Sequence, residues 1–158
     1  MDEADLLELL AEELVALQSE AVIDSPQPLS VYGRTKLESE RIVLDAAVDG
    51  LVVRTLWLYG HLHAVRPNLV TWPLAALARG ESISIVGDQW GNPTYVHDLA
   101  RALVELSRQR VSGLFHMGGT TFLTREELVR QVAAHFQLDA SGIETVTTAP
   151  GWCLDTKG

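Results

Sequence analysis

Tyr32 and Lys36 are the residues of this sequence whose types and spacing first indicate chemistry. They stand in the stretch VYGRTKLESER, residues 31–41, and residues four apart on a helix share one face. A lysine ammonium beside a tyrosine favours the phenolate, which makes the phenol a usable proton donor near neutral pH. The pair therefore predicts reduction of a carbonyl group, whose oxygen needs a proton as it gains negative charge. Taken alone, the same spacing also suits an exposed helix face without chemistry.

Helices and strands are expected to alternate around this pair. A helix is expected from about residue 31 to 47, and the apolar stretch LVVRTLWLYG, residues 51–60, suits a strand of a parallel sheet covered on both faces. Thr124 and Glu127 form a capping box at the start of a helix. The other expected segments are helices at 68–79, 97–109 and 124–136 and strands at 82–86, 113–119 and 144–149. This alternation predicts an α/β domain.

Two leucine patterns predict which helix faces are buried. The 97–109 helix is expected to bury the stripe of Leu99, Leu103 and Leu106. Residues 2–20 are expected to form an acidic amphipathic helix that packs on the domain or makes an oligomer contact. Its stripe consists of Leu7, Leu10, Leu14 and Leu17. We therefore divide the chain into residues 1–24, the acidic helix with its connector, and residues 25–158.

Composition excludes several classes of protein. The formal net charge is -9, and no Lys or Arg lies in residues 1–20, so the charge is concentrated there and no basic face for nucleic acid is expected. Neither a run of about 18 apolar residues nor a signal sequence is found, which predicts a cytoplasmic protein without a membrane span. A single cysteine, Cys153, excludes an internal disulfide. His61 and His63 lack a ligand pattern, so no metal site is expected.

Five segments, in order, resemble a known family. They are PLSVYGRTKLESER, LVVRTLWLYG, VGDQWGNPTYVHDLARAL, GLFHMGG and WCLDT, spread over about residues 26–156. Together they resemble the dTDP-4-dehydrorhamnose reductases of the extended short-chain dehydrogenase/reductase group, and DQWGNPT is more specific to these enzymes than the Tyr-Lys spacing. The resemblance implies a Rossmann-like fold with a doubly wound, mostly parallel sheet. It also implies NADPH or NADH as hydride donor and reduction of the 4-keto group of a dTDP-linked deoxysugar in rhamnose synthesis.

The resemblance also implies roles for individual residues. Tyr32 would be the general acid and Lys36 its partner, and both would contact the cofactor together with Thr55. The implied substrate contacts are Arg54, Trp57, Asp88, Gln89, Asn92 and Thr94. From the residues alone, alternatives stay open: Trp57 also suits packing at a strand end, and the polar loop residues also suit turns and caps. The Gly118-Gly119 pair suits a turn at a strand end better than a phosphate cradle.

Only the C-terminal half of the family is represented in this sequence. It contains no G-x-G-x-x-G turn to hold a cofactor pyrophosphate, and no Ser or Thr lies in residues 1–17, where the family carries a further catalytic hydroxyl. We therefore expect the chain alone to be inactive. Half a Rossmann sheet leaves an open edge, which we expect a homo-oligomer or a partner chain with the cofactor-binding half to cover.

Two other functions are compatible with the sequence. The chain could serve as a non-catalytic regulatory or binding module, like the beta subunit of methionine adenosyltransferase, which resembles the same reductases. Alternatively, it could be a structural domain that assembles through the acidic leucine helix of residues 2–20.

Overall fold

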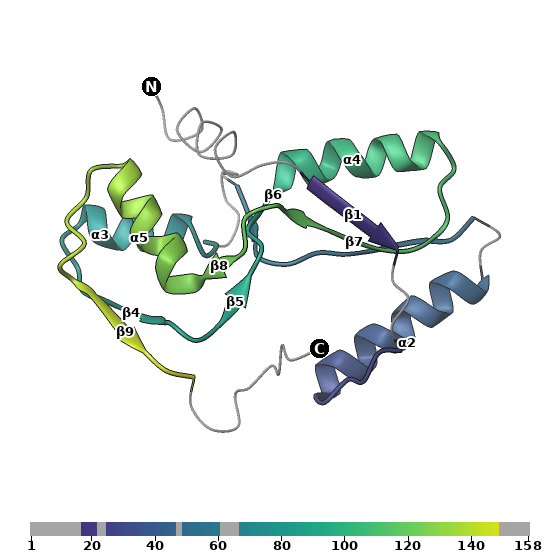
Figure 1. The fold of residues 1–158 in the computed structure, drawn as a ribbon, viewed down its shortest axis with the longest axis horizontal. Helices are drawn as coiled ribbons and strands as arrows, with labels where there is room; N and C mark the ends of the chain where they lie inside the picture. Colours follow the sequence, from purple (N-terminus) through teal and green to yellow (C-terminus); the bar gives the residue numbers. More distant parts are fainter. Residues whose placement is uncertain (1–16, 22–24, 47–48, 61–66, 149–158) are drawn as a thin grey trace.

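A three-stranded sheet forms one part of the molecule (Figure 1). The computed structural model describes residues 17–21, 25–46, 49–60 and 67–148. The strands are β1 (Leu17–Ala21), β2 (Leu51–Arg54) and β7 (Gly113–Gly119), in the order β1-β7-β2. β2 runs parallel to β7, with Leu51 opposite Gly113 and Arg54 opposite His116. Helices α2 (Val31–Ala46) and α4 (Val96–Arg108) lie on either side of this sheet.

The prediction of a helix over residues 2–20 is wrong at its C-terminal end. Leu17–Ala21 form strand β1, which pairs antiparallel with β7 from Leu17 opposite Gly119 to Ala21 opposite Phe115. The unpaired edge of β7 offers this segment backbone hydrogen bonds, and such long-range pairing overrides a local helical pattern. The rest of the predicted helix lies outside the described residues.

Helix α2 matches its predicted boundaries, whereas strand β2 covers only the first four residues of the predicted stretch 51–60. Both elements are less buried than expected. α2 has no buried residue, and all four residues of β2 are half-buried. Within the described residues β2 pairs only with β7, so one edge of β2 is open. The described part of the chain therefore leaves β2 only partly covered.

A second group of elements packs around helix α5 (Arg125–His135). Strands β4 (Ile83–Val86) and β9 (Ile143–Val146) pair in parallel, and α3 (Thr71–Ala78) lies beside α5 (Figure 1). Pro73 lies in the first turn of α3, where its missing N–H costs nothing. One cluster of buried side chains contains Val70, Leu128 and Val132, and a second contains Ile83, Val129 and Ala133. Successive residues of α5 thus belong to two core clusters.

Two very short strand pairs join the two groups. β3 (Leu58–Tyr59) runs parallel to β6 (Thr94–Tyr95), and β5 (Trp90–Gly91) pairs antiparallel with β8 (Leu123–Thr124). The expected capping box of α5 is confirmed: the Thr124 hydroxyl accepts from the Glu127 N–H at 3.1 Å, and the Glu127 carboxylate accepts from the Thr124 N–H at 2.7 Å. The two strand pairs hold residues of the loop DQWGNPT, since β5 lies within this loop and β6 begins at its last residue.

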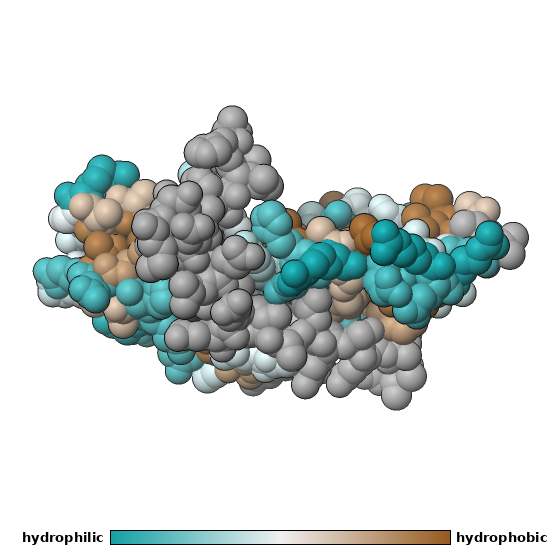
Figure 2. Space-filling view, turned by 90° about the horizontal axis from the view of Figure 1, so that it is seen from above, coloured by the Kyte–Doolittle hydropathy of each residue, from teal (hydrophilic) through white to brown (hydrophobic). Residues whose placement is uncertain are grey.

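The apolar stripe predicted on α4 is only partly buried. Leu99 is buried, but Leu103 is exposed and Leu106 is half-buried. Figure 2 shows hydrophobic residues at the surface at the end of the molecule that holds α2 and α4. Among the described helices none is long and apolar enough to cross a membrane.

Candidate functional site

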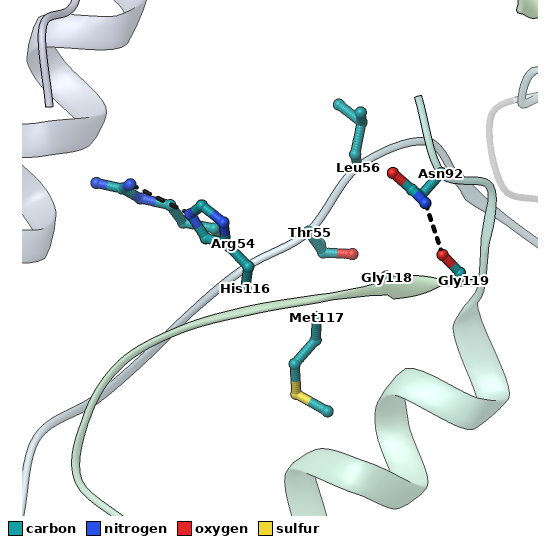
Figure 3. A pocket seen from close by; sticks show the side chains of 8 residues that line it. All are labelled: Arg54, Thr55, Leu56, Asn92, His116, Met117, Gly118 and Gly119. Atoms are coloured by element: carbon teal, nitrogen blue, oxygen red, sulfur yellow. Dashed lines mark hydrogen bonds between the residues drawn. The ribbon is translucent and has the colours of Figure 1, made fainter. Parts of the chain in front are cut away.

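A cavity of about 360 Å³ lies where β2 ends, beside the C-terminal part of β7 (Figure 3). Open α/β sheets bind ligands outside the carboxyl ends of their strands, which is the position of this cavity. Three lining residues follow one another along the chain at the end of β2, four belong to β7 and one to the DQWGNPT loop. They are Arg54, Thr55, Leu56, Asn92, His116, Met117, Gly118 and Gly119.

Arg54 is held by a carboxylate from α2. Its Nε and Nη2 donate to the two carboxylate oxygens of Glu40 at 2.8 and 2.7 Å, and its Nη1 lies 3.3 Å from Nε2 of His116 (Figure 3). The hydrogen bond and the charge of Arg54 lower the pKa of Glu40, and the pKa of Arg54 is raised in return. Because the pair is bidentate and mostly shielded from solvent, it fixes α2 against β2.

Tyr32 and Lys36 lie side by side on α2, as the spacing predicts. The Lys36 ammonium stands 5.7 Å from the centre of the Tyr32 ring. Both side chains are exposed, Tyr32 to 68%, and neither lines the cavity. Glu40, one turn further along the same helix, is anchored to Arg54 at the cavity wall, so the helix that carries the pair is attached to this wall.

Asn92 and Thr94 join the DQWGNPT loop to β7. The Asn92 side-chain amide donates to the carbonyl oxygens of Gly119 at 2.8 Å and Thr121 at 3.3 Å. Thr94 is fully buried, and its hydroxyl contacts the Asn92 carbonyl at 3.1 Å and the Gly119 N–H at 3.4 Å. Asn92 thus lines the cavity and is bonded to the lining residue Gly119, whereas Thr94 does not line the cavity but contacts both of these residues.

The side chains of Asp88 and Gln89 are hydrogen-bonded to Thr148. The Asp88 carboxylate accepts from the Thr148 N–H at 2.9 Å and from its hydroxyl at 2.7 Å, and the Gln89 amide donates to the same hydroxyl at 3.2 Å. These hydrogen bonds lower the pKa of Asp88. The structure therefore brings Asp88 and Gln89 together with Thr148, two residues after the end of β9, and not with the cavity.

Trp57 directly follows the cavity-lining residues and turns toward α5. Its φ is 49°, in the left-handed region, which is rare for a bulky side chain. Its ring packs against the core cluster that contains Leu128, and the guanidinium carbon of Arg125 lies 5.3 Å from the ring centre. A side chain at Gly91 would come within 2.8 Å of the Trp57 ring, so the glycine of DQWGNPT is required by this close approach.

Three ionisable residues near the site were not assigned to it by sequence reasoning. Glu40 could have been found, because it continues the helix face of Tyr32 and Lys36 at the next four-residue step. His116 and Arg125 could not, because strand pairing and the packing of α5 bring them to Arg54 and Trp57 from distant parts of the chain. Among the described residues no cluster of three potential metal ligands is present; His61 and His63 lie outside them.

The fold and the cavity define a Rossmann-like α/β domain with a site at its strand ends, and comparison with known proteins identifies the family. A family model described as the RmlD substrate binding domain matches residues 19–151. The chain therefore belongs to this family. The predicted resemblance to dTDP-4-dehydrorhamnose reductases and the predicted fold class are confirmed.

Relatives of two kinds match by sequence. A dTDP-4-keto-6-deoxy-D-glucose reductase of Streptomyces niveus is 43% identical over 90 residues, which are 56% of this chain and 30% of that protein. The beta subunit of methionine adenosyltransferase 2 of Bos taurus is 31% identical over 134 residues, 80% of this chain and 40% of that protein.

Solved structures agree with the sequence relatives. The dTDP-4-dehydrorhamnose reductase of Bacillus anthracis, in complex with NADP, superimposes with a TM-score of 0.73 at 29% identity, over 79% of this chain and 43% of that one. The dTDP-4-dehydrorhamnose reductase ortholog of Clostridium acetobutylicum gives a TM-score of 0.70 at 29% identity, over 82% of this chain and 45% of that one. The chain thus spans less than half the length of each of these relatives.

Proposed function

We propose that the chain is the substrate-binding part of a nicotinamide-dependent reductase that converts the 4-keto group of a dTDP-linked deoxysugar to an alcohol. The observation that carries the proposal is the Tyr32-Lys36 pair on a helix fixed by the Glu40–Arg54 ion pair to the wall of a strand-end cavity. The match to reductases of dTDP-linked sugars supports the substrate class.

Each residue of the pair has a defined task in this reaction. A bound nicotinamide cofactor would supply the hydride, which would leave negative charge on the sugar oxygen. Tyr32 donates its phenolic proton to that oxygen, and the Lys36 ammonium stabilises the phenolate that remains. Thr55, which lines the cavity next to Arg54, offers a hydroxyl for orientation. Asn92 keeps the opposite rim in place through its bond to Gly119.

The residues present fit one part of a nicotinamide cofactor. The exposed ammonium of Lys36 suits the hydroxyl groups of a ribose, and the Tyr32 hydroxyl lies on the same helix face. A Gly-rich turn for the pyrophosphate does not occur in the sequence. We propose that Tyr32, Lys36 and Thr55 would contact the cofactor and that a cofactor-binding half, in the same polypeptide or in a partner, would hold its pyrophosphate.

A thermal-shift titration tests the proposed substrate class. dTDP, dTDP-rhamnose and NADPH are added separately, with thymidine as a control for the base alone. A ligand that binds only the folded state stabilises it, by about 2.7 kcal/mol at 100 times its Kd. We expect dTDP and dTDP-rhamnose to raise the unfolding midpoint and NADPH to leave it unchanged. Absence of a shift with both dTDP compounds would contradict the proposal.

A second function is favoured by one observation. The methionine adenosyltransferase beta subunit matches 80% of this chain, a larger share than the Streptomyces niveus reductase does. In this second candidate the chain is a regulatory module whose partner enzyme does the chemistry, and the Tyr32 hydroxyl is not needed. Replacement of Tyr32 by Phe separates the two functions, because only the reductase requires a proton donor at this position.

A further inference from the structure

Arg125 is a half-buried cation without a carboxylate partner among the described residues. It is the first residue of α5, and its backbone N–H donates to the Gln89 carbonyl at 3.1 Å. Its Nε is buried and has no hydrogen-bond partner. By contrast, Arg54, Arg79 and Arg130 each donate to a glutamate at 2.7 to 2.8 Å. The guanidinium of Arg125 therefore retains donors that no described side chain uses.

The acidic residues nearest to Arg125 in the chain are already engaged. Glu126 accepts from Arg130 at 2.8 Å, and Glu127 accepts from the Thr124 N–H in the capping box. Burial without a counterion lowers the pKa of Arg125. A partly buried charge is unfavourable unless a partner compensates it, so the arrangement calls for an anion from outside the described residues.

The Trp57 ring lies against this cation, and Trp57 directly follows the cavity-lining Leu56 in the chain. The guanidinium carbon lies 5.3 Å from the ring centre, a cation–π contact. Trp57 adopts its left-handed φ of 49° immediately after Leu56, which lines the cavity. Such a conformation is unfavourable for a bulky side chain and persists only where the surroundings enforce it; here the Thr94 N–H donates to the Trp57 carbonyl at 3.1 Å. The backbone directly after the cavity wall is thus held in the conformation in which the Trp57 ring lies against Arg125.

We propose that Arg125, supported by Trp57, binds a phosphate group of the ligand at the edge of the cavity. The guanidinium is planar, and its two terminal nitrogens, unlike the buried Nε, could donate to two oxygens of a phosphate. The identification of that phosphate as part of the diphosphate of a dTDP-sugar rests on the proposed function. The anion-binding role itself rests only on the unpaired cation, its burial and its support by Trp57.

Calorimetric titration of the full chain with inorganic pyrophosphate, dTDP and thymidine tests this proposal. Arg125→Met removes the charge but keeps an unbranched side chain, and Arg125→Lys keeps the charge without the fork. Arg108→Met is the matched control, because Arg108 is exposed and its Nη1 lies as far as 3.9 Å from the Glu105 carboxylate. We expect Arg125→Met to weaken dTDP and pyrophosphate binding by about 10-fold to 100-fold, as loss of a charge-assisted hydrogen bond does.

The other variants and ligands distinguish a role of Arg125 in ligand binding from a purely structural role. Arg125→Lys should bind dTDP with intermediate affinity, Arg108→Met should bind it as the wild type does, and thymidine binding should not change in either methionine variant. A purely structural Arg125 would lower the unfolding midpoint of Arg125→Met while leaving the dTDP affinity of the folded protein unchanged, and this result overturns the inference.

The outcomes also distinguish this inference from the proposed function. If dTDP binds the wild type and Arg125→Met equally, the inference fails and the proposed function stands. If pyrophosphate binding depends on Arg125 while neither dTDP nor dTDP-rhamnose binds, the inference stands and the proposed substrate class fails. If the wild type binds neither pyrophosphate nor dTDP, both fail.

Discussion

At the scale of single residues, Arg54 joins the helix of Tyr32 and Lys36 to the cavity. Two of its nitrogen atoms are bonded to Glu40 and a third lies beside His116, so little of its fork is left for a substrate. The chain instead has a second arginine, Arg125, whose donors are not used in this way. We therefore expect the two arginines to have different tasks, because of these two only Arg54 is bonded to a carboxylate among the described residues.

The Glu40–Arg54 pair leads to a prediction about pH. Arg54 lowers the pKa of Glu40 below its ordinary value of 4.5, so the folded state favours the carboxylate. The resulting stabilisation is fully present above pH 4.5 and is lost as the pH falls through the lowered pKa of the folded state. At pH 7, Glu40→Gln should reduce the free energy of unfolding by about 1 to 3 kcal/mol, and this difference should shrink in acid.

Urea unfolding of wild type and variant between pH 7 and pH 3 measures this difference. Glu38→Gln is the control, because Glu38 is exposed and 3.9 Å from Arg41. Exposed pairs contribute little, so we expect a change below about 1 kcal/mol for this control. Equal pH dependence of wild type and Glu40→Gln would show that the pair contributes nothing to folding.

At the scale of secondary structure, helix α5 begins at Arg125 and contributes buried residues to both core clusters. Its N-terminus is closed by two reciprocal hydrogen bonds between Thr124 and Glu127. Because Arg125 follows the cap directly, the cap also decides where its guanidinium lies relative to Trp57.

Removal of the capping hydroxyl tests this element. Thr124→Ala should lower the free energy of unfolding by about 1 kcal/mol, the usual loss for a helix N-cap. Thr35→Ala on α2 is the control, because the Thr35 hydroxyl is exposed and bonds only to the Tyr32 carbonyl within the same helix. Chemical denaturation measures both. A loss in Thr35→Ala as large as that in Thr124→Ala would mean that the cap has no special contribution.

Strand β1 shows the limit of local patterns at this scale. Residues 17–21 continue the predicted acidic helix in sequence, yet they pair with β7 along five successive residues. Hydrogen bonding to an available strand edge is a long-range effect that leucine spacing does not contain.

At the scale of the whole molecule, the open edge of β2 and the exposed face of α2 are adjacent. Both elements are less covered than a parallel sheet requires, and Leu29, Val31 and Ile42 are exposed on and before α2. We propose that the cofactor-binding half of the reductase pairs with β2 and covers α2. Strand pairing would satisfy the backbone groups of the open edge, and apolar contact would stabilise the docked helix.

Complementation tests this arrangement. The chain alone should not oxidise NADPH with a dTDP-4-keto sugar, whereas addition of the N-terminal, G-x-G-x-x-G-bearing half of a related reductase should restore turnover. In that mixture Tyr32→Phe should lower kcat by about 100-fold or more, because it removes the general acid. Turnover by the chain alone would contradict the prediction, and full activity of Tyr32→Phe would favour the regulatory module.

The sequence by itself determined most of the elements and the family. Helical and strand periodicity located α2, α3, α4, α5 and the main strands, since these patterns arise from the local geometry of each element. The Tyr32-Lys36 spacing and the DQWGNPT loop identified the reductase family. The Thr124-Glu127 capping box was predictable because its hydrogen bonds join residues three apart.

Only the tertiary structure decided which charged groups meet. Arg54 and His116 are 62 residues apart in the chain, and strand pairing places them side by side. Trp57 and Arg125 meet because a strained turn and a capped helix converge. Asp88 and Gln89 bind Thr148, 60 and 59 residues away, and not the cavity. Contacts of this kind depend on how the helices and strands pack, and that packing cannot be predicted from residue spacing along the chain.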